Sequence, residues 1–361
     1  MDAIDNALAG IPVIGVVWQA IGYLVAAAAN PTISGQVLFF AAPLILGAMC
    51  GIMNERSGVV NIGIEGMMLM AAFFGFLGAG LAAQLFPGDP SPIFGITLPL
   101  LIGVLTAVLI GMAISALHAW LAISIRANQI ISGTIINIFA GGLTGYLHAL
   151  IITPNPGLGG AIFASWQPPQ ALLDVPVLGW AVNLLLHHGP IAISSLIVVV
   201  ILQILLFRSR WGLRTRAVGE HPKAAETVGI NVIRVRYRNV ILGGIFAGLA
   251  GAFLTLESQG HFQLQLTAGR GFIALAAVIV GRWTPVGAFA AAVLFAATDA
   301  LRIAIGIAPP TGQLGSVFQL IPAQFYQALP YIVTIVVLAG VVGRSSPPAA
   351  DGLPYERESA S

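Results

Sequence analysis

The amino-acid sequence predicts an all-α protein that crosses a membrane several times. Of its 361 residues, 58% are hydrophobic and only 8% are charged, and the mean hydropathy is +0.94. This composition is far more apolar than a soluble domain needs to fill its core. Several apolar runs also reach the roughly 20 residues with which a helix crosses a hydrocarbon core of about 30 Å. Composition and run length therefore indicate the same class.

Ten apolar segments follow one another along the chain, and we expect each of them to form a membrane helix. They lie at 11–29, 36–53, 62–86, 94–124, 128–152, 190–207, 239–257, 271–281, 286–305 and 320–342. The eighth segment is too short for a straight span, so it is expected to be tilted, broken or re-entrant, and the helix count lies between eight and ten.

These segments divide the chain into three parts. We expect an N-terminal part with the first helix at 1–35, a transmembrane domain at 36–342, and a disordered tail at 343–361. The tail is expected to be disordered because it is polar and contains several prolines.

Basic residues gather in the connection 208–238 and set the expected orientation. Of 15 Lys and Arg residues, eight lie there: Arg208, Arg210, Arg214, Arg216, Lys223, Arg234, Arg236 and Arg238. Because short cytoplasmic loops are enriched in Lys and Arg, we place this connection in the cytoplasm. Counting crossings from it places both termini in the cytoplasm. The turn with Glu55 and Arg56 is expected there too, facing water or a partner. The alternative is that the whole stretch 54–69 is a re-entrant break, which would carry both charges deeper.

The sequence shows no motif for catalysis, nucleotide hydrolysis or metal binding. It lacks the GxxxxGK[ST], HExxH and GxSxG patterns, and its histidines are scattered. The lone Cys50 excludes an intrachain disulfide and a cysteine-based metal site. We therefore expect no catalytic residue, metal ligand, cofactor or nucleic-acid partner in this chain. If a chain without these motifs moves a substrate across the membrane, it must use an ion gradient or take energy from a partner protein.

The middle of the basic connection, HPKAAETVGI, predicts a short helix that begins at Pro222 and ends at Gly229. Ala224, Ala225 and Val228 are expected to form a small apolar face between charges. A short exposed helix of this kind suits docking into a groove of another protein. The alternative is a loop that only fixes topology by its positive charge, and the residues alone leave both open.

Three motifs give the chain a resemblance to a transport family. The stretch AVGEHPKAAETVGIN resembles the coupling loop of ABC importer permeases. The stretches NERSGVVNIGIEGMML (54–69) and LTAGRGFIALAAVIVGRWTPVGA (266–288) are similar to signatures of the nucleoside branch, within the group of permeases for ribose, branched-chain amino acids and nucleosides. The similarity covers nearly all of 36–342. His221 and Thr284 depart from the family motifs, because Asn is the usual residue at both of these motif positions.

The resemblance implies a permease bundle of ten helices with an inverted pseudo-repeat, in the plasma membrane of a prokaryote. It implies three kinds of partner: two cytoplasmic ABC ATP-binding domains, a second related permease, and an extracytoplasmic substrate-binding protein or lipoprotein. ATP and Mg would bind to the ATP-binding partner. The residues that it assigns to coupling are Gly219, Glu220, Pro222, Ala224, Ala225 and Gly229.

Five polar residues are candidates for the substrate path: Asn61, Glu65, Asn137, Glu257 and Arg270. Charges inside a membrane bundle are functional candidates because their burial is unfavourable, and an asparagine offers the donor and acceptor that a nucleobase or ribose needs. The structural alternative stays open. In that interpretation Glu257 and Arg270 lie in wet interfaces, and the asparagines satisfy the backbone at helix breaks. Arg270 is also a possible partner of Glu257.

The sequence thus favours the membrane subunit of a nucleoside importer that works by alternating access. Within the same family, a simple sugar such as ribose or a branched-chain amino acid is the alternative substrate. A self-sufficient secondary transporter or channel is the alternative from another class. It needs a coupling group near mid-membrane, whereas the charged candidates lie mostly near helix ends.

Overall fold

The computed structural model describes residues 12–87, 96–159, 162–307, 309–337, 339 and 346–356. Within these ranges every regular element is a helix. The helices before the basic connection are α2 (Pro12–Ala29), α3 (Pro31–Glu55), α4 (Ile64–Leu85), α5 (Leu98–Ala119), α6 (Gln129–Leu147), α7 (Gln170–Leu173), α8 (Pro176–Leu186) and α9 (Pro190–Arg208). Those that follow are α10 (Arg210–Glu220), α11 (Pro222–Thr227), α12 (Val232–Ala252), α13 (Arg270–Val280), α14 (Pro285–Ile307), α15 (Gly312–Gln319) and α16 (Ala323–Val336). The fold is all-α, as the sequence predicts.

Three π-helical turns lengthen the membrane helices. They are η1 (Trp120–Ser124) after α5, η2 (His148–Ile152) after α6 and η3 (Phe253–Gln259) after α12. With these extensions, seven helices among the described residues are long and apolar enough to cross a membrane: Ile33–Glu55, Ile64–Leu85, Leu98–Ser124, Gln129–Ile152, Pro190–Arg208, Val232–Gln259 and Pro285–Ile307. The chain is a multi-pass membrane protein. The count of about ten crossings stays a prediction.

The short eighth segment is a helix, α13, and its 11 residues are too few for a straight span. Each of the other predicted segments also falls on helix in its described part. Residues 1–11, most of 338–345 and 357–361 lie outside the described residues.

The chain divides into two compact units. The first comprises Met1–Ala41, Trp166–His188 and Val293–Ala339. It is held in part by two polar contacts: the Trp180 indole donates to the Ala28 carbonyl at 3.2 Å, and the Leu314 amide donates to Gln19 Oε1 at 3.0 Å. The second unit comprises Ala42–Ser165, Gly189–Ala292 and Gly340–Ser361 and contains all the coupling and path candidates.

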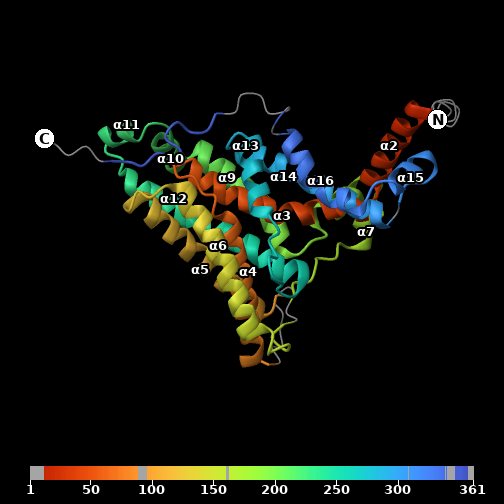
Figure 1. The fold of residues 1–361 in the computed structure, drawn as a ribbon, viewed down its shortest axis with the longest axis horizontal. Coiled ribbons are helices and arrows are strands. Elements are labelled where there is room, and N and C mark those ends of the chain that lie inside the picture. Colours follow the sequence, from red (N-terminus) through yellow and green to blue (C-terminus); the bar gives the residue numbers. More distant parts are fainter. Residues whose placement is uncertain are drawn as a thin grey trace. The chain divides into compact units, whose positions relative to one another are not determined.

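Helices α4, α5 and α12 lie side by side in the second unit (Figure 1). Glycines permit this close approach, since a Cβ on Gly111 would lie 2.4 Å from the Gly244 carbonyl oxygen and one on Gly251 would lie 2.4 Å from that of Met68. Small residues at helix contacts are typical of membrane bundles, where backbone packing replaces the hydrophobic effect. These three helices form the frame on which the polar residues are placed.

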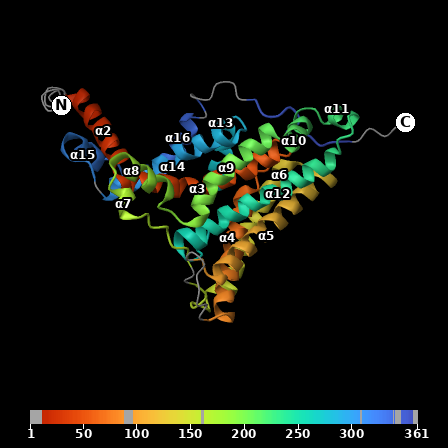
Figure 2. The ribbon, with the colours of Figure 1, turned by 180° about the vertical axis from the view of Figure 1, so that it is seen from behind.

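The segment 346–356 differs from the sequence prediction of a disordered tail. It runs past α10 and α11 in the same unit (Figure 2), and Ala350 and Tyr355 in it are buried. The prediction was wrong for this part of the tail because composition does not reveal the hydrogen bonds that its backbone makes. The rest of the predicted tail lies outside the described residues.

Candidate functional site: the helix breaks and the coupling face

The break between α3 and α4 is stabilised by side chains from α5 and α6. The Val60 amide donates to Gln129 Oε1 at 2.7 Å, and the Val60 carbonyl lies 2.9 Å from His118 Nε2. His118 Nδ1 in turn lies 2.9 Å from the hydroxyl of Ser132. Backbone groups without a hydrogen-bond partner are unfavourable in a membrane bundle. This hydrogen-bond network therefore stabilises the non-helical conformation of the turn.

Asn61 and Asn137 bind backbone at the same break. Asn61 Oδ1 accepts from the Gly63 amide at 3.0 Å. Asn137 accepts from the Gly66 amide at 2.7 Å and donates to the Ile62 carbonyl at 3.0 Å. These contacts are those of the structural alternative, in which the asparagines satisfy the backbone.

Glu65 binds the N-terminus of α13. Its two carboxylate oxygens accept from the amides of Gly269, at 2.7 Å, and Gly271, at 2.6 Å. The first amides of a helix have no partner inside that helix, and the helix dipole favours negative charge there. A Cβ on Gly271 would lie 2.6 Å from the Glu65 backbone, so only glycine permits this approach. Glu65 thus fixes the start of the short helix.

Glu257 makes the equivalent contact with α9. Its carboxylate accepts from the amides of Ile191, at 2.7 Å, and Ala192, at 3.0 Å. It is buried, and a Cβ on Gly189 would lie 2.3 Å from its carboxyl carbon. Both membrane glutamates therefore use their oxygens on helix N-termini.

Arg270 binds elsewhere. Its Nη1 donates to the carbonyls of Leu266, at 3.2 Å, and Thr267, at 3.3 Å. The possible pairing of Arg270 with Glu257 is not what the structure shows, because their charged groups bind different backbone segments. All five path candidates thus contact backbone, and their role toward substrate stays a prediction.

The short helix α11 begins at Pro222 and is followed by Gly229 with φ +82°, as the sequence predicts. The predicted apolar face is wrong in one residue. Ala224 and Val228 are exposed, Val228 to 75%, whereas Ala225 is buried. Ala225 packs in a cluster with Val218, Val232, Val235 and Tyr355. Its neighbour Tyr355 belongs to the segment that was expected to be disordered, so its burial was not readable from the helix.

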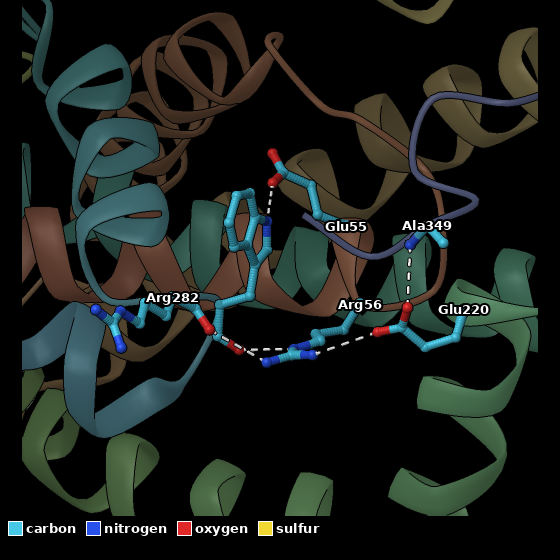
Figure 3. Close-up of polar contacts among 6 residues, drawn as sticks. Glu55, Arg56, Glu220, Arg282 and Ala349 are labelled. Carbon is cyan, nitrogen blue, oxygen red and sulfur yellow. Dashed lines mark hydrogen bonds and ion pairs between the residues drawn. The ribbon is translucent and has the colours of Figure 1, made fainter. Parts of the chain in front are cut away.

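Glu220 and Gly219 connect α10 to two other segments (Figure 3). One oxygen of Glu220 lies 4.0 Å from Arg56 Nη1, and the other accepts from the Ala349 amide at 3.1 Å. The Gly219 carbonyl accepts from the Ala350 amide at 2.9 Å. A Cβ on Gly219 would lie 2.3 Å from the Arg56 carbonyl oxygen, which explains the glycine.

Arg56 and Glu55 bind the turn between α13 and α14 (Figure 3). Arg56 donates to the carbonyls of Trp283, at 2.8 Å, and Arg282, at 3.2 Å. The indole of Trp283 donates to Glu55, which is buried. The expectation that both charges face water or a partner is therefore wrong for Glu55. Burial lowers the pKa of Arg56, nearby Glu220 raises it and Arg216 lowers it.

Two charged residues with interior contacts were missed by the sequence interpretation. Arg236 was assigned to the positive charge of the loop, yet it is 1% exposed and donates to the carbonyls of Leu353, at 2.9 Å, and Ala350, at 3.4 Å. Asp351 lies beside it, and burial, followed by the charge of Glu55, raises the pKa of Asp351 to about 8, while Arg236 lowers it. No local signal marks either residue, because Arg236 becomes buried and Asp351 partly buried only when the distant segments meet.

A groove of about 1060 Å³ opens between the start of α11 and the segment 346–356. Its lining residues are Glu220, His221, Pro222, Lys223, Ala224, Ala349, Ala350, Leu353, Pro354, Tyr355 and Glu356. The exposed face of α11 and this groove form the surface that we call the coupling face. The described residues contain no group of His, Cys, Asp and Glu that could hold a metal ion.

Comparison with known proteins gives one family. The family described as "Branched-chain amino acid transport system / permease component" matches residues 33–338. The chain is 38% identical over 335 residues to the guanosine ABC transporter permease protein NupQ of Bacillus subtilis (strain 168), with 88% of this chain and 94% of that protein covered.

Two other relatives cover a similar part of the chain. The nucleoside ABC transporter permease protein NupC of Lactococcus lactis subsp. cremoris (strain MG1363) is 34% identical over 329 residues, with 90% of this chain and 96% of that protein covered. The putative glucose ABC transporter permease protein TsgC13 of Haloferax volcanii is 33% identical over 318 residues, with 84% and 90% covered. No solved structure matches the chain.

Replacing Glu65 by Gln should destabilise the protein and leave substrate affinity unchanged. The amide keeps one acceptor and loses the charge that two backbone amides bind, at a cost of about 1–3 kcal/mol. Thermal unfolding of the purified variant measures the loss, and the KM of uptake measures affinity. Asp174→Asn, at the exposed residue directly after α7, is the matched acid-to-amide control and should change neither. A raised KM at unchanged stability would instead place Glu65 on the substrate path.

Proposed function

This chain belongs to the family of branched-chain amino acid transport system permease components, and we propose that it carries nucleosides into the cell as the membrane subunit of an ATP-driven importer. The observation that carries the proposal is similarity along almost the whole chain to two relatives named as guanosine and nucleoside permeases, over 88% and 90% of this chain. The family match at residues 33–338 includes α10, α11 and the helix breaks, so the similarity is not limited to one shared motif.

The energy for transport comes from a partner in this proposal. Two cytoplasmic ATP-binding domains hold ATP and Mg, and this chain contains neither a catalytic residue nor a cofactor. A second, related permease and an extracytoplasmic substrate-binding protein or lipoprotein complete the importer. Support comes from the relatives, which are named as permease proteins of ABC transporters.

The membrane glutamates favour this proposal over a self-sufficient secondary transporter. Intramembrane carboxylates that mark proton or ion pathways are expected to exchange their partners during transport. Glu65 and Glu257 each bind two backbone amides at a helix start. Releasing either would leave those amides without a partner, which is unfavourable in a membrane bundle.

The exposed face of α11 is proposed as the surface that receives the ATP-binding domain, with Gly219, Glu220, Pro222, Ala224 and Gly229 forming or shaping it. Ala225 supports the helix from beneath, because it is buried. The surface lies in the cytoplasm in this proposal, with both termini on the same side of a prokaryotic plasma membrane. Closure of the ATP-binding domains moves α11, and the bundle alternates between outward and inward access.

Reconstitution tests the function and the substrate together. We expect liposomes with the complete importer to accumulate guanosine when ATP is supplied, because the ATP-binding domains provide the energy. Liposomes with this chain alone should accumulate none under a proton or sodium gradient. Uptake by the isolated chain under a gradient would disprove the proposal. Glucose is the competitor to include, since one relative is named as a putative glucose permease; competition by glucose and not by uridine would make a sugar the substrate.

Replacing Ala224 by Trp should reduce uptake while ATP hydrolysis continues. Ala224 is exposed on α11, so the larger side chain obstructs docking without repacking the interior. We expect nucleoside uptake per ATP hydrolysed to fall by about fivefold or more, in the range of typical coupling energies. Ala149→Trp, at an exposed alanine in η2, is the matched control. Equal uptake per ATP in both variants would remove α11 from the docking surface.

A further inference from the structure

The segment 346–356, which we call the strap, runs past α10 and α11 (Figure 2). It makes hydrogen bonds to α10, α11 and α12. The Ala349 and Ala350 amides donate to the Glu220 carboxylate, at 3.1 Å, and the Gly219 carbonyl, at 2.9 Å. These two contacts lie directly before α11. They place the strap at the start of the proposed coupling helix.

The other end of α11 is bound by Tyr355. Its hydroxyl donates to the carboxylate of Glu226, and its ring covers the buried side of Ala225. The next residue, Glu356, accepts from Arg126 at 2.8 Å in the turn between η1 and α6. That last pair is exposed and contributes little to stability. The strap therefore contacts the end of α10 directly before α11, and α11 itself at Glu226 and at the buried Ala225.

The interior contact of the strap is with Arg236 on α12. This guanidinium is almost completely buried, and strap carbonyls accept two of its hydrogen bonds. A buried charge that loses its hydrogen-bond partners is strongly destabilising. Gly58, which has φ +84°, follows the α3 turn, and a Cβ there would lie 2.7 Å from Arg236 Nη2. The strap and the α3–α4 turn therefore both contact the buried side chain of Arg236 on α12.

From this geometry we propose that the strap is a positioning element that fixes α11 to α12 and to the α3–α4 turn, so that movement of α11 reaches the membrane helices. The inference rests on the proposed function of α11. Apart from the strap, α11 contacts α10 and α12 through the small cluster of Ala225 with Val218, Val232 and Val235. In this proposal that cluster alone lets part of the displacement of α11 be lost before it reaches the membrane helices.

The strap is tested in the complete reconstituted importer by measuring uptake and ATP hydrolysis in the same vesicles. Removal of residues 346–361 should lower the nucleoside moved per ATP by about fivefold or more. Tyr355→Phe keeps the ring in its cluster and loses the hydroxyl contact with Glu226, so a smaller decrease is expected. The matched control is Tyr146→Phe, at an exposed tyrosine of α6, which should behave as the unaltered chain.

A second experiment uses the full-length chain, so that the proposal is still tested if the shortened chain does not reach the membrane. Nitroxide labels on Ile233→Cys and Leu353→Cys, in a Cys50→Ala background, report the distance between α12 and the strap; both side chains are exposed. We expect the same distance distribution with and without trapped ATP. A shift of the distribution, or unchanged uptake per ATP in the shortened chain, would overturn the inference. ATP-driven uptake by the unaltered importer, measured in parallel, shows that the proposed function itself holds.

Discussion

The requirement that every buried backbone group find a partner governs this structure. The hydrocarbon core of a bilayer offers backbone groups no hydrogen bonds, so buried helix starts and breaks there need side-chain partners. Glu65 does this for α13, Glu257 does it for α9, and Asn137 does it for the break before α4. Because α13 has only 11 residues, its position depends on the residue that binds its first turn.

The same requirement explains the coupling face. Arg236 is buried, and two strap carbonyls accept hydrogen bonds from its guanidinium. Arg56 in turn donates to carbonyls of the turn between α13 and α14, while Glu220 lies within ion-pair distance of it. Charged side chains that donate to or accept from backbone groups therefore join the α11 region, the strap and the turn before α14. In the proposed function, this connection transmits movement from the ATP-binding domains to the membrane helices.

The sequence predicted the local features of the fold well and the distant contacts poorly. Apolar run length located the helices, and Pro222 and Gly229 located α11, because these signals lie within a few residues of one another. It did not reveal that Glu65 binds amides 204 and 206 residues away, nor that Ala225 faces inward against Tyr355. The disorder expected for the tail was wrong in the strap for the same reason: its polar composition is matched by Arg236, Glu220 and Glu226 only after the chain folds.

A structure of the assembled importer with a nucleoside bound would test the central claim most directly. The claim is that the membrane glutamates stabilise helix starts and do not bind substrate. The account predicts that Glu65 still accepts from the Gly269 and Gly271 amides and that Glu257 still accepts from the Ile191 and Ala192 amides, with the nucleoside in contact with neither. A nucleoside hydrogen-bonded to either carboxylate, with the helix amides released, would contradict it.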